Sequence, residues 1–312
     1  MAQMVKTAGI DVSKAWLDVA IWPTREATRV SRDAAGIATL IAWLTEHEVI
    51  RVGLEASGGY DREVTDGLQA AGFEVAQLNP LRVRRFAQAK GRLAKNDTAD
   101  ARTIAQFTAV MVEDVPSQRR RDLDALAELL TYRRQLKGWS TDCTNQLEHL
   151  RDAAWRKDIE HKKAGFERDL KRIDQKLADM VAKHDDWSAL ARRLRTVPGV
   201  GPVVSATLIA LLPELGALSR RAIASLVGLA PFDHDSGKHQ GERHIWGGRK
   251  LVREALYMAA LSARTHNPVI AAFAERLKGK EPKVILTACM RKLLVILNAM
   301  LRDGTDWRAV DA

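Results

Sequence analysis

The sequence is poor in cysteine and in aromatic residues. Its 312 residues include only 2 cysteines, Cys143 and Cys289, too few for a disulfide framework or a zinc site built from four cysteines. Phenylalanine, tryptophan and tyrosine together make up 5% of the chain. Base stacking on aromatic side chains is therefore not expected to dominate any binding of nucleic acid.

The sequence pattern also lacks a membrane anchor. No apolar signal core precedes Asp11. The least charged stretch, residues 197–213, is interrupted by prolines and glycines and is too short to span a bilayer comfortably. We therefore predict a cytoplasmic protein with no membrane partner.

Positive charge is what the chain has in excess. Lysine plus arginine number 49 and aspartate plus glutamate 39, which gives a net charge of +10 and an isoelectric point of about 9.7. Such an excess favours a polyanionic partner such as nucleic acid or an anionic surface. The hydrophobic share of 46% is enough for a real core, and the length is typical of more than one domain.

The N-terminal third reads as mixed α/β. Alternating apolar residues predict strands, and apolar residues spaced three and four apart predict helices. The predicted strands are residues 5–12, 16–22, 27–31, 50–54 and 73–78, and the predicted helices are residues 34–47, 60–71, 81–89 and 97–110. Three strands in a meander, followed by helix, strand, helix, strand and helix, match the order of a ribonuclease H-like (RuvC-like) fold.

Residues 116–193 carry no strand signal and are dense in charge. Two heptad series predict an antiparallel coiled-coil hairpin, with its break at Lys162, Lys163 and Gly165. The first series is Leu129, Leu136, Cys143 and Leu150, and the second is Phe166, Ile173, Met180 and Trp187. A spacer with solvated faces and an oligomerisation arm that contacts nucleic acid are both compatible with this pattern.

The chain from Arg195 onward is predicted to be helical, and it begins with a glycine-rich turn. Gly199 and Gly201 suggest a helix-hairpin-helix element whose backbone N–H groups bind a DNA phosphate. A plain glycine-rich connection between helices is the alternative. We place the domains at residues 1–113, 114–193 and 194–312.

Four carboxylates are predicted to meet in the first domain. Asp11 and Glu55 end two strands that the fold places side by side, and Asp97 and Asp100 share one face of a helix. Each one alone is equally well explained as a turn or cap residue. Four together repel one another unless a cation lies between them, and carboxylate oxygens suit Mg²⁺. One or two such ions would support phosphoryl transfer.

Three motifs now carry a resemblance to a known family. Residues 9–14, 55–60 and 95–101 resemble the DEDD-type transposases of bacterial insertion sequences, in the insertion sequence 110 family that includes the pilin-inverting recombinases. The resemblance implies that Asp11, Glu55, Asp97 and Asp100 form the metal-binding tetrad.

A second part of the resemblance lies in residues 228–249. These resemble the family's helical C-terminal transposase domain, in which a serine between an acidic residue and a glycine is the nucleophile, and the matching position is Ser236. By itself this tripeptide is typical of a turn. The neighbouring cations Lys238, Arg243, Arg249 and Arg253 are predicted to bind nucleic acid and to hold a phosphate.

The resemblance implies a recombinase that excises and inserts a mobile element in the bacterial cytoplasm, at the nucleoid. Mg²⁺ at the tetrad would activate the phosphate that Ser236 attacks, and a covalent serine–DNA link would preserve the bond for rejoining. The implied partners are double-stranded DNA at the element ends and target, a structured bridge RNA, and further copies of the chain in a dimer or tetramer.

Two alternatives remain open at this point. A Holliday-junction-type nuclease would use the same metal cluster with water as the nucleophile, which predicts that Ser236 is dispensable. A catalytically inactive nucleic-acid-binding protein predicts that Asp11→Ala changes nothing measurable.

Overall fold

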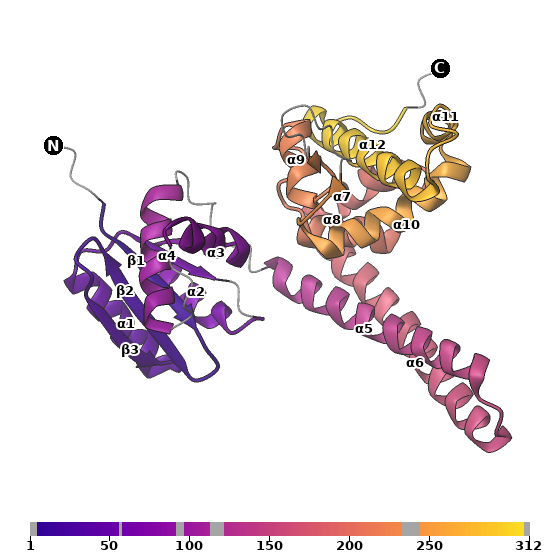
Figure 1. Cartoon of the computed structure of the whole chain (residues 1–312). Helices are drawn as coiled ribbons and strands as arrows, with labels where there is room; N and C mark the ends of the chain where they lie inside the picture. The colour runs from indigo at the N-terminus through magenta and orange to yellow at the C-terminus, as the bar shows by residue number, and fades with distance from the viewer. Residues whose placement is uncertain (1–4, 56–57, 92–96, 113–121, 233–243, 309–312) are drawn as a thin grey trace. The chain divides into compact units, whose positions relative to one another are not determined.

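The structure is a computed structural model that describes residues 5–55, 58–91, 97–112, 122–232 and 244–308, without the side chains of residues 97–99 and 122. The chain divides into two compact units, Met1–Arg119 and Arg120–Ala312. The described residues form seven strands and twelve helices, so the chain is mixed α/β and mostly helical (Figure 1). The finer division into three domains stays a prediction.

The first unit is built around a five-stranded sheet. β1 (Thr7–Val12) pairs antiparallel with β2 (Trp16–Trp22), which pairs antiparallel with β3 (Ala27–Ser31). β4 (Arg51–Glu55) lies parallel to β1 on its other side, and β5 (Glu74–Leu78) lies parallel to β4. The strand order is β3-β2-β1-β4-β5. All five predicted strands are confirmed.

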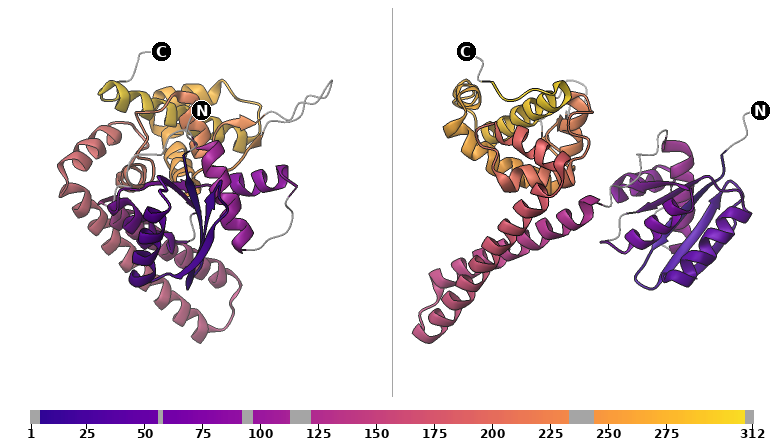
Figure 2. Two further views of the ribbon diagram at one scale, coloured as in Figure 1. Left: turned by 90° about the vertical axis from the view of Figure 1, so that its left-hand side faces the viewer. Right: turned by 180° about the vertical axis from the view of Figure 1, so that it is seen from behind.

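Helices cover both faces of this sheet. α1 (Ala34–Glu46) and α2 (Asp61–Ala70) pack on one face, where Ile10 of β1 lies in a core with Leu40 and Leu68. α3 (Pro80–Ala89) and α4 (Asp97–Met111) cover the other face (Figures 1 and 2). The four predicted helices are confirmed, with ends that differ by at most one residue.

The second unit begins with a long helical hairpin. α5 (Asp122–His149) and α6 (Ala153–Ala182) run side by side and project from the helices that follow (Figure 2). Part of the predicted seam is correct, because Leu136, Cys143 and Ile173 are buried, whereas Trp187 of the second series lies on the next helix, Asp185–Arg195. The hairpin itself is therefore confirmed.

The predicted position of the break in this hairpin is wrong. The chain turns at residues 150–152, and Lys162, Lys163 and Gly165 lie inside α6. Asp152 caps the new helix, since its Oδ1 accepts hydrogen bonds from the backbone N–H groups of Ala154 at 2.9 Å and of the next residue at 3.0 Å. The lysines form ion pairs one helical turn away within α6, so their charge does not end the helix.

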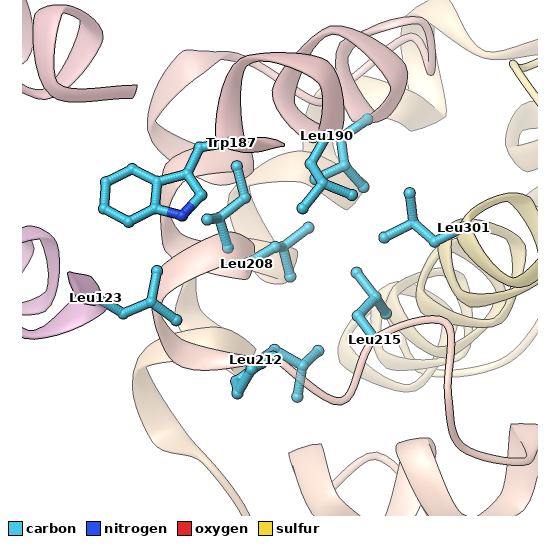
Figure 3. A pocket seen from close by; sticks show the side chains of 10 residues that line it. Leu123, Trp187, Leu190, Leu208, Leu212, Leu215 and Leu301 are labelled. Carbon is cyan, nitrogen blue, oxygen red and sulfur yellow. The ribbon is translucent and has the colours of Figure 1, made fainter. Parts of the chain in front are cut away.

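The remaining helices form a compact cluster. They are α7 (Asp185–Arg195), α8 (Pro202–Leu211), α9 (Arg220–Val227), α10 (Lys250–His266), α11 (Pro268–Glu275) and α12 (Pro282–Asp303). Figure 3 shows Leu123 of α5 close to Trp187 of α7 and Leu208 of α8, around a cavity of about 70 Å³ whose lining residues are all apolar. The base of the hairpin thus shares one apolar core with this cluster.

α12 is long and apolar enough to cross a membrane by length and composition. However, Cys289, Leu293, Leu294 and Leu297 on this helix are fully buried in the core of the second unit. A core helix of a folded protein has the same composition as a membrane span. We therefore interpret α12 as the central core helix of this unit.

Candidate active site

Two of the predicted carboxylates lie at one edge of the sheet. Ile10 pairs with Leu54 across the parallel strands β1 and β4, so the next residues, Asp11 and Glu55, end neighbouring strands at the same edge. Side chains two apart on a strand share a face. Asp11 therefore lies on the same face as Gly9, and Glu55 on the same face as Gly53.

That face is the one covered by α4, and glycine makes the close approach possible. A Cβ atom on Gly9 would lie 2.1 Å from the backbone N of Ala105 and 2.3 Å from the backbone O of Ala101. The Thr7 hydroxyl donates a hydrogen bond to the backbone O of Ala105 at 2.9 Å. Thr7 contacts Ala105, whereas Gly9, which is nearer the end of β1, also lies against Ala101, which is nearer the start of α4. The first turn of the helix therefore lies towards the edge that carries Asp11.

The first turn of α4 contains the other two predicted carboxylates. Asp97 begins the helix and Asp100 follows one turn later, at the end of α4 that lies towards this edge. Asp11, Glu55 and Asp100 are partly buried, whereas the side chain of Asp97 lies outside the described side chains. Within the described part of the chain, no three His, Cys, Asp or Glu side chains form a group that would hold a metal. The four-carboxylate metal site therefore stays a prediction.

A further carboxylate, Asp18 on β2, was not predicted. It pairs with Asp11 in the register of β1 and β2, and cross-strand partners share a face of the sheet. Asp18 is only 6% exposed, and Arg29 of β3 donates two hydrogen bonds to its carboxylate at 2.9 and 3.0 Å. The sequence signal was one charged residue within the apolar strand Trp16–Trp22.

A buried aspartate anchors the turn at Gly58 and Gly59, before α2. Asp61 is 3% exposed, and its carboxylate accepts hydrogen bonds from the backbone N–H of Gly59 at 3.2 Å and from the Gln77 side chain at 2.7 Å. Gly58 and Gly59 both have positive φ, a backbone conformation that other residues rarely adopt. This carboxylate therefore ties the turn at residues 58–61 to β5.

The predicted nucleophile lies outside the described residues. Ser236 belongs to residues 233–243, as do Lys238 and Arg243. The segment is bracketed by a short antiparallel ladder in which Phe232 of β6 (Pro231–Phe232) pairs with His244 of β7 (His244–Ile245). The expectation of an all-helical region is therefore wrong here, because two residues per strand are too few for a recognisable alternation.

The two described arginines near this segment make contacts within the protein. Arg249 forms an ion pair with Glu214 and also donates to the backbone O of Leu211 at 3.0 Å. Arg253 donates to the backbone O of Val227 at 3.0 Å and to that of Gly247. Arg249 thus joins the end of α8 to the start of α10, and Arg253 joins the end of α9 to α10. Their binding of nucleic acid stays a prediction.

The pair of Arg249 and Glu214 also changes the ionisation of the carboxyl group. Partial burial acts to raise the pKa of Glu214, but the hydrogen bond and positive charge of Arg249 outweigh burial and hold that pKa below its ordinary value of 4.5. The carboxylate is therefore ionised at neutral pH and paired with the guanidinium.

The two glycines of the predicted helix-hairpin-helix turn differ in their surroundings. Gly199 has φ of +103°, and a Cβ there would lie 2.7 Å from the backbone O of Ala259 on α10. Gly201, the residue before α8, has nothing within 4 Å of such a Cβ. Packing alone explains the glycine at position 199, while position 201 leaves the backbone open to approach. Binding of DNA by either glycine stays a prediction.

Two family models match this chain. A model described as a transposase, of the DEDD domain of IS110 elements, matches residues 8–155. A second model, described as the transposase IS116/IS110/IS902 family, matches residues 191–275. Together these ranges contain the carboxylates at the sheet edge, Gly199, Gly201, Ser236 and the arginines around it.

Similar proteins agree with these matches. The pilin gene-inverting protein of Moraxella lacunata is 25% identical over 311 residues, which cover 95% of each chain. The uncharacterized 44.8 kDa protein of insertion element IS116 from Streptomyces clavuligerus is 23% identical over 357 residues, covering 89% of this chain and 88% of that protein. The uncharacterized 43.6 kDa protein of insertion element IS110 from Streptomyces coelicolor is 30% identical over 120 residues, covering 37% of this chain and 30% of that protein.

Both models describe transposases, and the first covers the α/β unit and α5 while the second covers most of the helices that follow the hairpin. The protein is therefore an enzyme of the transposase class that acts on DNA. More specifically, the chain belongs to the IS110 family of transposases, as its motifs predicted.

Proposed function

We propose that this chain excises and inserts an insertion-sequence element by cutting and rejoining DNA through a covalent serine–DNA intermediate. The observation that carries the proposal is the placement of Asp11 and Glu55 at one sheet edge, with the first turn of α4 above the same face. The strand order and the antiparallel meander support a ribonuclease H-like (RuvC-like) assignment for this unit. We also propose that the protein works in the bacterial cytoplasm.

The donor chemistry at this edge fits Mg²⁺. Carboxylate oxygens are the ligands that this ion prefers, and Asp11, Glu55, Asp97 and Asp100 would hold it. When bound, the ion would polarise the scissile phosphate and offset its negative charge.

The protein's own residues then have separate tasks. The Ser236 oxygen loses its proton and forms a bond to phosphorus, while the bond from phosphorus to a deoxyribose oxygen breaks and that oxygen takes up a proton. The resulting phosphoserine ester keeps one phosphoester bond in place of another, which allows rejoining without a further energy source. Arg249 and Arg253 support this step by holding the start of α10, through Glu214 after α8 and through Val227 at the end of α9.

We further propose that a structured bridge RNA selects the element ends and target by base pairing. Support comes from the +10 net charge, which suits backbone binding, and from family membership. Two or four copies of the chain would act together, so that the α/β unit of one copy serves the serine segment of another.

A search for a protein–DNA adduct tests the proposal. Cells would carry the chain with its native flanking DNA, and adducts would be separated on a denaturing gel after nuclease trimming. We expect an adduct in the wild type and with the control variant Ser225→Ala, and none with Ser236→Ala or Asp11→Asn. Nicking of DNA that persists in Ser236→Ala without any adduct would instead favour a nuclease that uses water. If the chain binds DNA but shows neither an adduct nor nicking that is lost in Asp11→Asn, the chain would be an inactive binding protein.

A further inference from the structure

The second unit contains a cleft whose lining includes none of the predicted site residues. It lies between α6, α7 and α8 and has a volume of about 520 Å³. Apolar side chains form much of its wall, among them Leu177 of α6, Ala191 of α7 and Val203 of α8. Every residue that lines the cleft belongs to the second unit, so the cleft is complete within one copy of the chain.

Three cations line this cleft without an ion-pair partner among the described residues. Lys171 comes from α6, while Arg192 and Arg195 lie three apart on the same face of α7. All three side chains are exposed. The two arginines also suit the negative end of the α7 dipole, but that does not account for a lysine on a different helix at the same cleft.

The one acidic residue in the cleft wall is already neutralised. Asp174 accepts hydrogen bonds from Arg133 of α5, with its Oδ2 at 3.1 Å from the guanidinium. The cleft therefore presents three uncompensated positive charges above an apolar wall. A ligand with regularly spaced negative charges and apolar groups between them would match it.

The start of α8 adds hydrogen-bond donors at the same cleft. Pro202 and Val203 line it, and Gly201, the residue before them, has no side chain that caps the helix. The first backbone N–H groups of a helix have no partner within the helix and favour anions. Because a Cβ on Gly201 would meet nothing within 4 Å, the backbone is open to a ligand on that side.

We propose that this cleft binds the sugar–phosphate backbone of double-stranded DNA, with phosphates on Lys171, Arg192 and Arg195 and sugars against the apolar wall. The inference rests on the proposed function, and it assigns to the second unit a binding surface whose lining includes neither Ser236 nor the carboxylates of the first unit. Phosphate contacts fix the position of a duplex without reading its sequence.

The salt dependence of DNA binding tests the cleft directly. Each phosphate contact contributes about −0.9 to the slope of log K against log salt concentration. The triple variant Lys171→Gln, Arg192→Gln, Arg195→Gln is therefore expected to reduce the magnitude of that slope by about 2 to 3. The single variant Lys171→Gln should lower it by about 1. The full-length chain and a duplex of arbitrary sequence would be used, because neither recombination nor a target site is needed.

A control of equal charge separates the cleft from net charge. The triple variant Arg221→Gln, Lys280→Gln, Lys283→Gln removes the same charge from exposed positions that do not line the cleft. A slope close to that of the wild type in this control supports the cleft, whereas equal reductions in both triple variants would overturn it. A duplex RNA of the same length is the second arm, and a slope that changes for RNA alone would overturn the assignment to DNA.

The result also distinguishes this inference from the proposed function. A wild-type chain that binds DNA, together with a cleft variant of unchanged slope, would overturn the cleft and leave the serine mechanism standing. If no adduct that depends on Ser236 is found but the cleft variant has a reduced salt slope, the mechanism is overturned and the cleft is retained. A wild-type chain that binds no duplex DNA would overturn both.

Discussion

The two units hold their predicted functional residues in different ways. In the first unit, strand register places Asp11 beside Glu55, and a helix in backbone contact with the sheet fixes the position of Asp100. In the second unit, the described arginines Arg249 and Arg253 make contacts that hold the protein together. The comparison shows that regular hydrogen bonding can position reactive groups directly, whereas in a helical cluster charged side chains are needed to build the support.

The largest expected effect follows from placing a side chain between β1 and α4. Gly9→Val would bring side-chain atoms against the backbone of Ala101 and Ala105, which cannot move without shifting the helix. We expect the first unit to lose about 3 kcal/mol or more of stability. Hydrogen exchange read by mass spectrometry would show lost protection in β1 and α4. Gly138→Ala on α5, where a Cβ meets nothing within 4 Å, is the control, and unchanged protection in Gly9→Val would show that the close approach is wrong.

The glycines before α8 offer a matched pair in the second unit. Gly199→Ala combines a positive φ with a contact of 2.7 Å to backbone, so we expect a loss of about 1 to 3 kcal/mol. Gly201→Ala adds a methyl group in open space and should stay within about 0.5 kcal/mol of the wild type. Hydrogen exchange in α8 and α10, measured across a denaturant series, gives the change in unfolding free energy for each substitution. Equal effects of the two substitutions would contradict the different surroundings of these positions.

The pair of Glu214 and Arg249 gives a pH-dependent effect. The folded-state pKa of Glu214 lies below its ordinary value of 4.5, so its stabilisation is complete above that pH and is lost as the pH falls through the folded-state pKa. Allowing for the partial exposure of both side chains, we expect Glu214→Gln to cost about 1 kcal/mol at neutral pH. Unfolding measured from pH 7 down to acidic pH should show the wild type and the variant converging. A difference that stays constant with pH would exclude this pair as the cause.

The smallest effects locate the turn of the hairpin. Asp152→Ala removes the cap of α6 and should cost about 1 kcal/mol, whereas Gly165→Ala inside the helix should stabilise by about 0.5 kcal/mol. Both can be measured by exchange in α5 and α6. If the break were at residues 162–165 instead, Gly165→Ala would destabilise and Asp152→Ala would have little effect.

The sequence was most informative where hydrophobic periodicity was strong. Apolar residues alternate in β1 and β4, and Asp11 and Glu55 could be placed because they lie towards the ends of these strands. The hairpin turn was harder to locate, since lysines and a glycine look like a break although ion pairs between lysines and carboxylates support the helix. The true signal was the capping residue Asp152.

Other features depended on partners that are distant in the chain. Asp18 is accepted within an apolar strand because Arg29 on the next strand neutralises it, and that pairing needs the register of the sheet. Arg249 appeared available for phosphate until the fold brought Glu214 to it from 35 residues away. Such contacts arise from tertiary structure, which local patterns do not encode.

The two glycines that face α4 differ in how readily the chain can replace them during evolution or in a designed library. A Cβ on Gly53 would lie 1.9 Å from the Thr108 hydroxyl, which is a side-chain atom. Alanine at both positions 53 and 108 removes that clash and leaves the next atoms at 3.0 and 3.1 Å, so a second substitution can rescue the first. Gly9 meets backbone atoms, which every residue at positions 101 and 105 would supply. Variation at position 53 should therefore be coupled to position 108, while position 9 has no compensating partner along α4.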